Sequence, residues 1–266
     1  MHCSAVRDED FYSLGGRITP GRAGAVERQE TLGWKPRADV EPWMVVDPID
    51  WTANPYDDRN WFAQVHGWRV MDAYLRDYRA TGDGAVLERV AGWMLAWAKY
   101  RRGVPPEISR LLDPISGMRA TRIAVVLDAV LPGDLEISER ERDGLWALAT
   151  EQATWLYTPG HIVMMNHAYF QVLGLELLCR VLHDQPWAAQ ARTYAIETFD
   201  RFVQTQFHRG GRPCGEHPEL PPTATSTCKT APPPSPANST PAEHWSSRRP
   251  AVRGAPSSCP PRSWPS

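Results

Sequence analysis

The sequence predicts an all-α fold, an incomplete α/α toroid of helical hairpins with a disordered Pro/Ser-rich C-terminal tail. Apolar residues recur at three- and four-residue intervals from about residue 61 to residue 207, whereas alternating β patterns are scarce. Short turns containing glycine or proline separate these patterns, as in helical hairpin arrays, α/α toroids and solenoids. No repeat of fixed period is present, which favours a toroid over a regular solenoid.

Six helices are predicted in order along the chain. The first carries large apolar side chains on one face from Trp61 to Tyr78 and ends at a glycine-containing turn, residues 81–84. The fourth has the clearest start, because Ser138 followed by Glu141 is the pattern of a capping box. The predicted helices span residues 61–78, 86–97, 118–130, 138–155, 162–182 and 187–207.

The composition changes near Gly210. Of the 25 prolines, 14 follow this residue, and beyond Pro213 the larger aliphatic side chains are those of Leu220 and Val252. Such a segment cannot bury enough apolar surface to offset the entropy lost on ordering. We therefore predict a partly ordered N-terminal extension over residues 1–45, a helical domain over 46–212 and a disordered tail over 213–266.

Composition also excludes several classes of function. A net charge of -2 argues against a dedicated nucleic-acid binder, and no apolar run reaches the length of a membrane span. The five cysteines show no CxxC or zinc-ligand spacing, and His161 and His167 are six residues apart, which does not suit a metal on a helix. We predict no metal and no cofactor. The start shows no signal peptide, and neither the compartment nor the oligomeric state is indicated.

The loop before the first predicted helix combines aromatic and polar side chains. It contains Trp51, Asn54 and Tyr56 and leads into Trp61 and Gln64. Aromatic faces stack on the C–H faces of sugars, and neighbouring polar groups can bind sugar hydroxyls. The alternative is that these aromatic side chains pack on the helical body.

A second polar group interrupts the fifth predicted helix. Asn166 lies on the same helical face as Phe170, while His167 and Gln171 lie on the next face, four residues apart. Buried polar side chains need partners, so Asn and His among apolar neighbours are unusual. Two other interpretations stay open: a satisfied structural pair, or Asn166 as the N-cap of a helix that starts later.

A third, weaker group follows two glycines, Gly210 and Gly211, and contains Glu216 and His217. Taken in order, the three groups and the Met118-Arg119-Ala120 tract resemble the heparinase II/III-like polysaccharide lyases, from about Trp51 to His217. The resemblance implies an α/α toroid, normally followed by a β-sandwich, and β-elimination on an acidic polysaccharide such as alginate or a glycosaminoglycan. It also implies a periplasmic or secreted protein.

The resemblance implies a role for each residue type. Asn166 and His167 are the predicted catalytic residues, because a neutral amide can stabilise the charge that develops on a uronate carboxylate when the C5 proton leaves. A Tyr or His removes that proton, and a Tyr protonates the leaving oxygen. The predicted substrate-binding residues are Trp51, Asn54, Tyr56, Trp61, Gln64, Arg119, Gln171, Glu216 and His217.

The chain departs from the family after His217. These lyases carry a tract resembling Glu-His-Ser-Pro-x-Tyr-His, but here no Tyr or second His closely follows Pro218. Codons for residues 219–222 can be GAA CTA CCA CCx, which read one nucleotide later give Asn-Tyr-His. We therefore interpret the chain as a lyase fragment that is out of frame after about residue 217 and inactive as written. The alternative is a genuine disordered tail.

Two other functions are also compatible with the sequence. One is a non-catalytic carbohydrate-binding helical module that uses the aromatic loop as its platform. The other is a glycoside hydrolase on an α/α toroid, which needs two carboxylates flanking one bond. Asp57, Asp58 and Glu216 are candidates for these carboxylates, but no pattern in the sequence pairs them.

Overall fold

The computed structural model describes residues 5–6, 24–130, 135 and 137–206. These residues are all-α, with a single isolated β-bridge between Trp34 and Trp43. The predicted tail, together with Glu216 and His217, lies outside the described residues. The α-helices are α2 (Ala25–Leu32), α3 (Arg59–His66), α4 (Asp72–Thr81), α5 (Gly84–Gly103), α6 (Pro106–Leu112), α7 (Ser116–Val130), α8 (Glu139–Tyr157), α9 (Asn166–Val181) and α10 (Ala188–Gln206), and the 3-10 helices are η1 (Arg69–Met71) and η2 (Asp113–Ile115).

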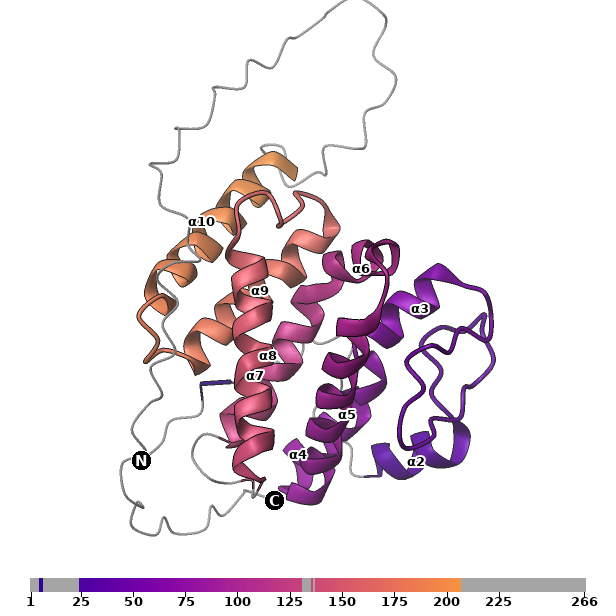
Figure 1. The fold of residues 1–266 in the computed structure, drawn as a ribbon. Helices are drawn as coiled ribbons and strands as arrows, with labels where there is room; N and C mark the ends of the chain where they lie inside the picture. The colour runs from indigo at the N-terminus through magenta and orange to yellow at the C-terminus, as the bar shows by residue number, and fades with distance from the viewer. Residues whose placement is uncertain (1–4, 7–23, 131–134, 136, 207–266) are drawn as a thin grey trace, which may run out of the picture.

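The helices form an arc of antiparallel hairpins, which is an incomplete α/α toroid. Figure 1 shows α2, α3 and α4 on one side of the molecule and α10 on the other, with α7 and α9 between them. The α4–α5 turn contains the predicted glycine, Gly82, in the left-handed conformation (φ 73°), and Asp83 caps α5. The capping box of Ser138 and Glu141 is present at the start of α8, as predicted.

The first predicted helix is wrong as one element. It breaks after His66 into α3, η1 and α4, because Trp68 adopts a left-handed conformation (φ 62°). The indole of Trp68 is fully buried and meets Trp97 edge to face at 5.2 Å. The three- and four-residue spacing of apolar residues continues across the break because α3 and α4 both bury their apolar side chains in the same core.

The start of the fifth predicted helix is also wrong. Helix α9 begins at Asn166 rather than at Ile162, and residues 158–165 form a loop. Ile162 is buried without being helical, so its apolar character extended the apparent pattern. Helix α6 and η2, between the second and third predicted helices, were not predicted, and Pro106 stands at the first position of α6.

Helices α7 and α9 lie parallel and in close contact at the centre of the fold. A Cβ atom on Gly117 would lie 2.3 Å from the carbonyl oxygen of Phe170, and one on Gly174 would lie 2.4 Å from the carbonyl oxygen of Gly117. Only glycine permits this backbone approach. The close pair brings the first turns of both helices to the same end of the molecule.

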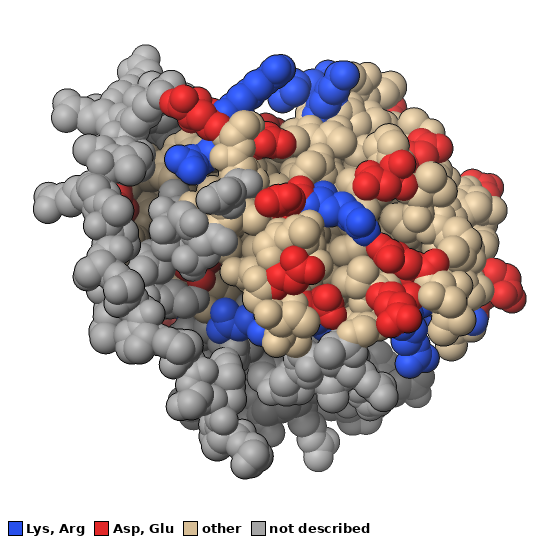
Figure 2. Space-filling view, turned by 90° about the horizontal axis from the view of Figure 1, so that it is seen from below, with Lys and Arg blue, Asp and Glu red and all other residues tan. Residues whose placement is uncertain are grey.

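Other helices run in the opposite direction beside this pair. Gln152, near the end of α8, accepts a hydrogen bond from Arg119 in the first turns of α7. Gln206, at the end of α10, donates a hydrogen bond to the carbonyl oxygen of Met164 just before α9. We call the end where α7 and α9 begin the site end. Seen from below the view of Figure 1, the surface intersperses Asp and Glu with Lys and Arg, as is usual for a solvated face (Figure 2).

Candidate functional site

Asn166 and His167 lie at the start of α9, at the site end. Asn166 is the first residue of the helix and is exposed, whereas His167 is half-buried. Met165 is the N-cap residue and makes no side-chain cap, so the interpretation of Asn166 as the N-cap is wrong. The first backbone N–H groups of a helix lack intrahelical partners and carry partial positive charge. The amide of Asn166 therefore stands where a carboxylate would be stabilised.

Gln171 fixes the loop that precedes these two residues. Its side chain is fully buried, accepts a hydrogen bond from the backbone N–H of Val163 (3.1 Å) and donates one to the carbonyl oxygen of His161 (3.3 Å). Both ends of the amide are therefore used by the backbone. As it lies, Gln171 holds the loop against α9 rather than facing a substrate.

Arg119 is also buried and bonded to the protein. Its guanidinium donates to Gln152 (3.1 Å) and to the carbonyl oxygens of His66 (3.2 Å) and Leu112 (3.0 Å), and it lies 4.5 Å from the centre of the Trp97 ring. Burial lowers the pKa of Arg119 to about 9. These hydrogen bonds connect α3, α6 and α8 to α7. Because Arg119 is only 1% exposed, its side chain has no free face for a sugar.

The two tryptophans of the predicted sugar platform lie in the core. Trp51 is 5% exposed and Trp61 is fully buried, the latter in edge-to-face contact with Trp43 and Tyr56. Neither ring can stack on a sugar as it stands, in line with the alternative of packing on the helical body. Tryptophan is rarely buried completely, but edge-to-face packing with other aromatic rings stabilises it there.

The remaining loop residues differ in exposure. Asn54 is exposed, and its side-chain oxygen accepts a hydrogen bond from the backbone N–H of Asp58 (3.1 Å). Tyr56 is half-buried and donates its hydroxyl to the carbonyl oxygen of Glu41 (2.7 Å). Gln64 is nearly buried and bonds to Asn60 and Arg69. Asn54 and Tyr56 are thus the residues of this group with surface available to a ligand.

His66, which the sequence did not single out, is central to this region. Its ring is fully buried, stacks on Tyr100 and lies against Trp51 and Phe62. The indole N–H of Trp97 donates to its Nδ1 atom (3.0 Å), which requires the proton of the neutral ring to be on Nε2. Burial, together with the charge of Arg119, lowers the pKa of His66 to about 3. The ring is therefore a neutral structural element.

Several of the predicted residues meet around the first turns of α7. Trp51 packs on His66, whose carbonyl oxygen accepts from Arg119, and Gly117 contacts Phe170 and Gln171 one turn after Asn166. The start of α9 thus contacts α7 directly, whereas the loop over 50–58 is connected to α7 through His66 at the end of α3. Among the described residues, no group of three or more His, Cys, Asp or Glu side chains could hold a metal ion. No described helix is long and apolar enough to cross a membrane.

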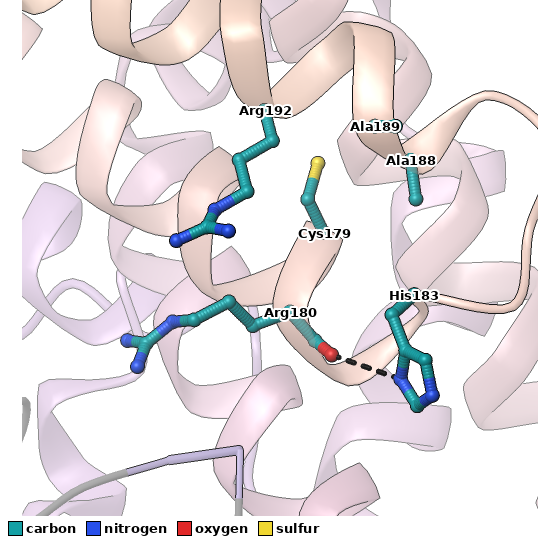
Figure 3. A pocket seen from close by; sticks show the side chains of 6 residues that line it. All are labelled: Cys179, Arg180, His183, Ala188, Ala189 and Arg192. Carbon is teal, nitrogen blue, oxygen red and sulfur yellow. Dashed lines mark hydrogen bonds between the residues drawn. The ribbon is translucent and has the colours of Figure 1, made fainter.

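A surface depression of about 380 Å³ lies at the other end of α9. Cys179, Arg180 and His183 line it from α9 and the following turn, and Arg192 lines it from α10 (Figure 3). Both arginines pair with the same carboxylate, that of Glu176, which offsets one of their two positive charges. This depression contains none of the predicted site residues.

The fold is similar to that of a carbohydrate-active enzyme of known structure. The chain superposes on heparan sulfate lyase HepC from Pedobacter heparinus with a TM-score of 0.58 and on a mutant of that enzyme with a TM-score of 0.59, at 15% sequence identity in each case. The match covers 77% of this chain and 33% of that chain, so this chain spans about a third of the lyase's length. No family model and no curated protein sequence matches the chain. The comparison establishes a fold like that of a polysaccharide lyase.

Proposed function

We propose that this chain is the helical part of a polysaccharide lyase that acts by β-elimination on a uronic-acid-containing polysaccharide, of the alginate or glycosaminoglycan type. The observation that carries the proposal is the exposed amide of Asn166 at the first position of α9. The fold of the heparan sulfate lyase supports it, since the similarity extends over most of this chain.

The proposed reaction requires charge stabilisation at the carboxylate beside C5. Loss of the C5 proton places negative charge on that carboxylate, and hydrogen-bond donors already in position stabilise it most effectively. Asn166 provides a neutral donor, and the N-terminus of α9 adds partial positive charge. The half-buried ring of His167 is proposed to assist in holding the sugar.

The substrate would lie across the site end, in contact with the exposed residues around α7. Asn54 and Tyr56 are the proposed contacts in the loop over 50–58. Arg119, Gln171, Trp51 and Trp61 are proposed to act through the residues they support, since their side chains are buried. This distribution suits an enzyme that holds its substrate with loops on a rigid helical body.

Asp50 and Asp58 do not suit the acid role in glycoside hydrolysis. That reaction needs one carboxyl group that stays protonated, with a raised pKa. The hydrogen bond from Arg37 holds the pKa of Asp58 below its usual range, and the hydrogen bond from Thr52 does the same for Asp50. Asp58 is further engaged as the N-cap of α3.

The test is an assay for unsaturated uronate products on alginate and several glycosaminoglycans. Two chains are compared: the chain as written, and one whose gene is read one nucleotide later after the codon for Pro218. We expect product from the second chain and none from the first. Product from the chain as written would place the complete catalytic set within it. If neither chain forms product but acidic oligosaccharides still bind, the chain is a sugar-binding module.

A further inference from the structure

The loop between α8 and α9 carries a histidine, His161, whose neutral tautomer is set by its contacts. The ring of His161 stacks on Trp155 with 4.5 Å between centroids and 30° between planes. Its Nδ1 atom lies 2.9 Å from the carbonyl oxygen of Trp155. A carbonyl oxygen only accepts hydrogen bonds, so Nδ1 carries the proton. The other ring nitrogen, Nε2, therefore holds a free electron pair in the neutral ring.

This second nitrogen is available to a ligand. His161 is half-buried, and Nε2 has no hydrogen-bond partner and is not buried, taken over the described part of the chain. A histidine that donates from Nδ1 to a backbone oxygen and presents a free Nε2 is an oriented proton acceptor. Stacking on Trp155 fixes the plane of the ring, so the direction of the electron pair is set as well.

The same loop leads directly to the candidate site. Gln171 binds the carbonyl oxygen of His161 and the N–H of Val163, which ties the loop to the second turn of α9. Asn166 follows His161 by five residues and begins that helix. One short, clamped loop therefore joins a proton acceptor to the amide proposed to stabilise a carboxylate.

We propose that His161 is the catalytic proton acceptor at C5 of the uronate, an assignment that rests on the proposed lyase function. Neutral His161 takes the C5 proton on Nε2 and becomes an imidazolium. The electron pair of the C5–H bond moves onto C5 and the adjacent carboxylate, where Asn166 stabilises it. Elimination then forms the C4–C5 double bond and breaks the C4–O bond, and the leaving oxygen takes a proton from a separate acid. Without that acid, the imidazolium returns a solvent-exchanged proton to C5.

If His161 is the proton acceptor, the chain as written should catalyse the proton transfer at C5 but not the elimination. In D2O it should exchange the C5 hydrogen of bound uronates for deuterium without forming an unsaturated product. The exchange is measured by loss of the H5 proton signal and gain of mass in oligosaccharides of alginate and of heparan sulfate. A neutral cello-oligosaccharide is the substrate control, because it lacks a carboxylate beside C5.

The decisive variant is His161→Asn. An Asn amide can still donate to the carbonyl oxygen of Trp155, so a role in holding the loop would survive, but it has no basic nitrogen. We expect the exchange rate to fall on the order of 10²–10⁴-fold. The matched control is His183→Asn at the other end of α9, because His183 makes the same kind of contact through Nδ1 to the carbonyl oxygen of Arg180 (3.2 Å, Figure 3). Its exchange rate should be unchanged.

Nitrogen-15 NMR of the imidazole rings tests the assignment of His161 independently of the proposed lyase function. The expected spectrum shows the tautomer of His161 with the proton on Nδ1, and addition of an alginate oligosaccharide should shift its Nε2 signal. The opposite tautomer, equal exchange rates for wild type and His161→Asn, or binding without any exchange would overturn the assignment alone. If no acidic oligosaccharide binds, both the assignment and the proposed function are overturned.

Discussion

Asn166 occupies a position where its amide is open to a ligand. It is exposed, it begins α9, and its side chain caps no backbone group. Asparagine is a modest helix former that usually favours the N-cap position. Helix propensity therefore does not explain why Asn166 lies one position after the N-cap residue, Met165. The proposed interaction with the carboxylate of a uronate would account for its location.

Replacement of Asn166 by Ala tests this role. In the chain whose frame is shifted after Pro218, the rate of unsaturated product formation should fall by about 10²-fold or more, because one donor to the developing charge is lost. The free energy of unfolding should change little, since the side chain is exposed. An unchanged rate would rule out a catalytic role for Asn166.

His66 makes the stability of the protein depend on pH. Its pKa is about 3 in the folded chain and near 6.5 in the unfolded chain, so between these values the unfolded state binds a proton that the folded state does not. The free energy of unfolding should therefore fall as the pH drops from 6.5 towards 3. A pKa shift of this size corresponds to roughly 5 kcal/mol once the pH is below both values.

The comparison is with His66→Gln, whose side-chain oxygen can still accept from Trp97 but does not titrate. Urea unfolding from pH 7 to pH 4 should show wild type losing stability relative to this variant. Parallel pH profiles for the two proteins would mean that His66 is protonated at its ordinary pKa in the folded chain.

At the scale of elements, the parallel pair α7 and α9 positions the site. The approach at Gly117 and Gly174 brings the first turns of both helices together, and Arg119 connects them to α3, α6 and α8 through hydrogen bonds. A buried guanidinium is stable only when its donors are paired, and here they bind carbonyl and amide oxygens. The site thus depends on contacts well outside the α9 turn.

Gly117→Ala should disrupt this pair. The added Cβ would lie 2.3 Å from the carbonyl oxygen of Phe170 and 2.4 Å from Cα of Gln171, and neither backbone atom can move without shifting α9. We expect a loss of about 3 kcal/mol or more in the free energy of unfolding, measured by urea denaturation.

Gly92→Ala in α5 is the matched control. No atom lies within 4 Å of the added Cβ there, and alanine is the better helix former, so this variant should gain about 0.5–1 kcal/mol. Equal effects of the two substitutions would contradict the close packing of α7 on α9.

The sequence was informative about elements and less so about their ends and their burial. The capping box at Ser138 and the Gly82 turn follow from local chemistry, and both were predicted correctly. The break at Trp68 and the start of α9 depend on packing against distant residues, which apolar spacing does not reveal. Trp51 and Arg119 have residue types suited to sugars, but their burial is decided by the folded helices around them. The sequence pattern marks His161 only as a possible metal ligand and gives no signal for His66, whose burial depends on contacts with Trp51, Phe62 and Tyr100.

At the scale of the whole molecule, the chain is an arc of helices with a fold like that of a heparan sulfate lyase, and the match spans about a third of that enzyme's length. In its described part the start of α9 contacts the first turns of α7, and the loop over 50–58 is connected to α7 through His66 of α3. The central claim is that an acidic polysaccharide lies across this end. The depression lined by Cys179 and Arg192 offers a different location for a ligand.

Hydrogen–deuterium exchange of the backbone amides tests this claim most directly. The chain is measured alone, with an alginate or heparan sulfate oligosaccharide, and with a neutral cello-oligosaccharide. Our account predicts that the acidic oligosaccharides protect two segments together, residues 50–66 and 158–171, and that the neutral one does not. Protection confined to residues 179–192, or no protection by any acidic oligosaccharide, would contradict it.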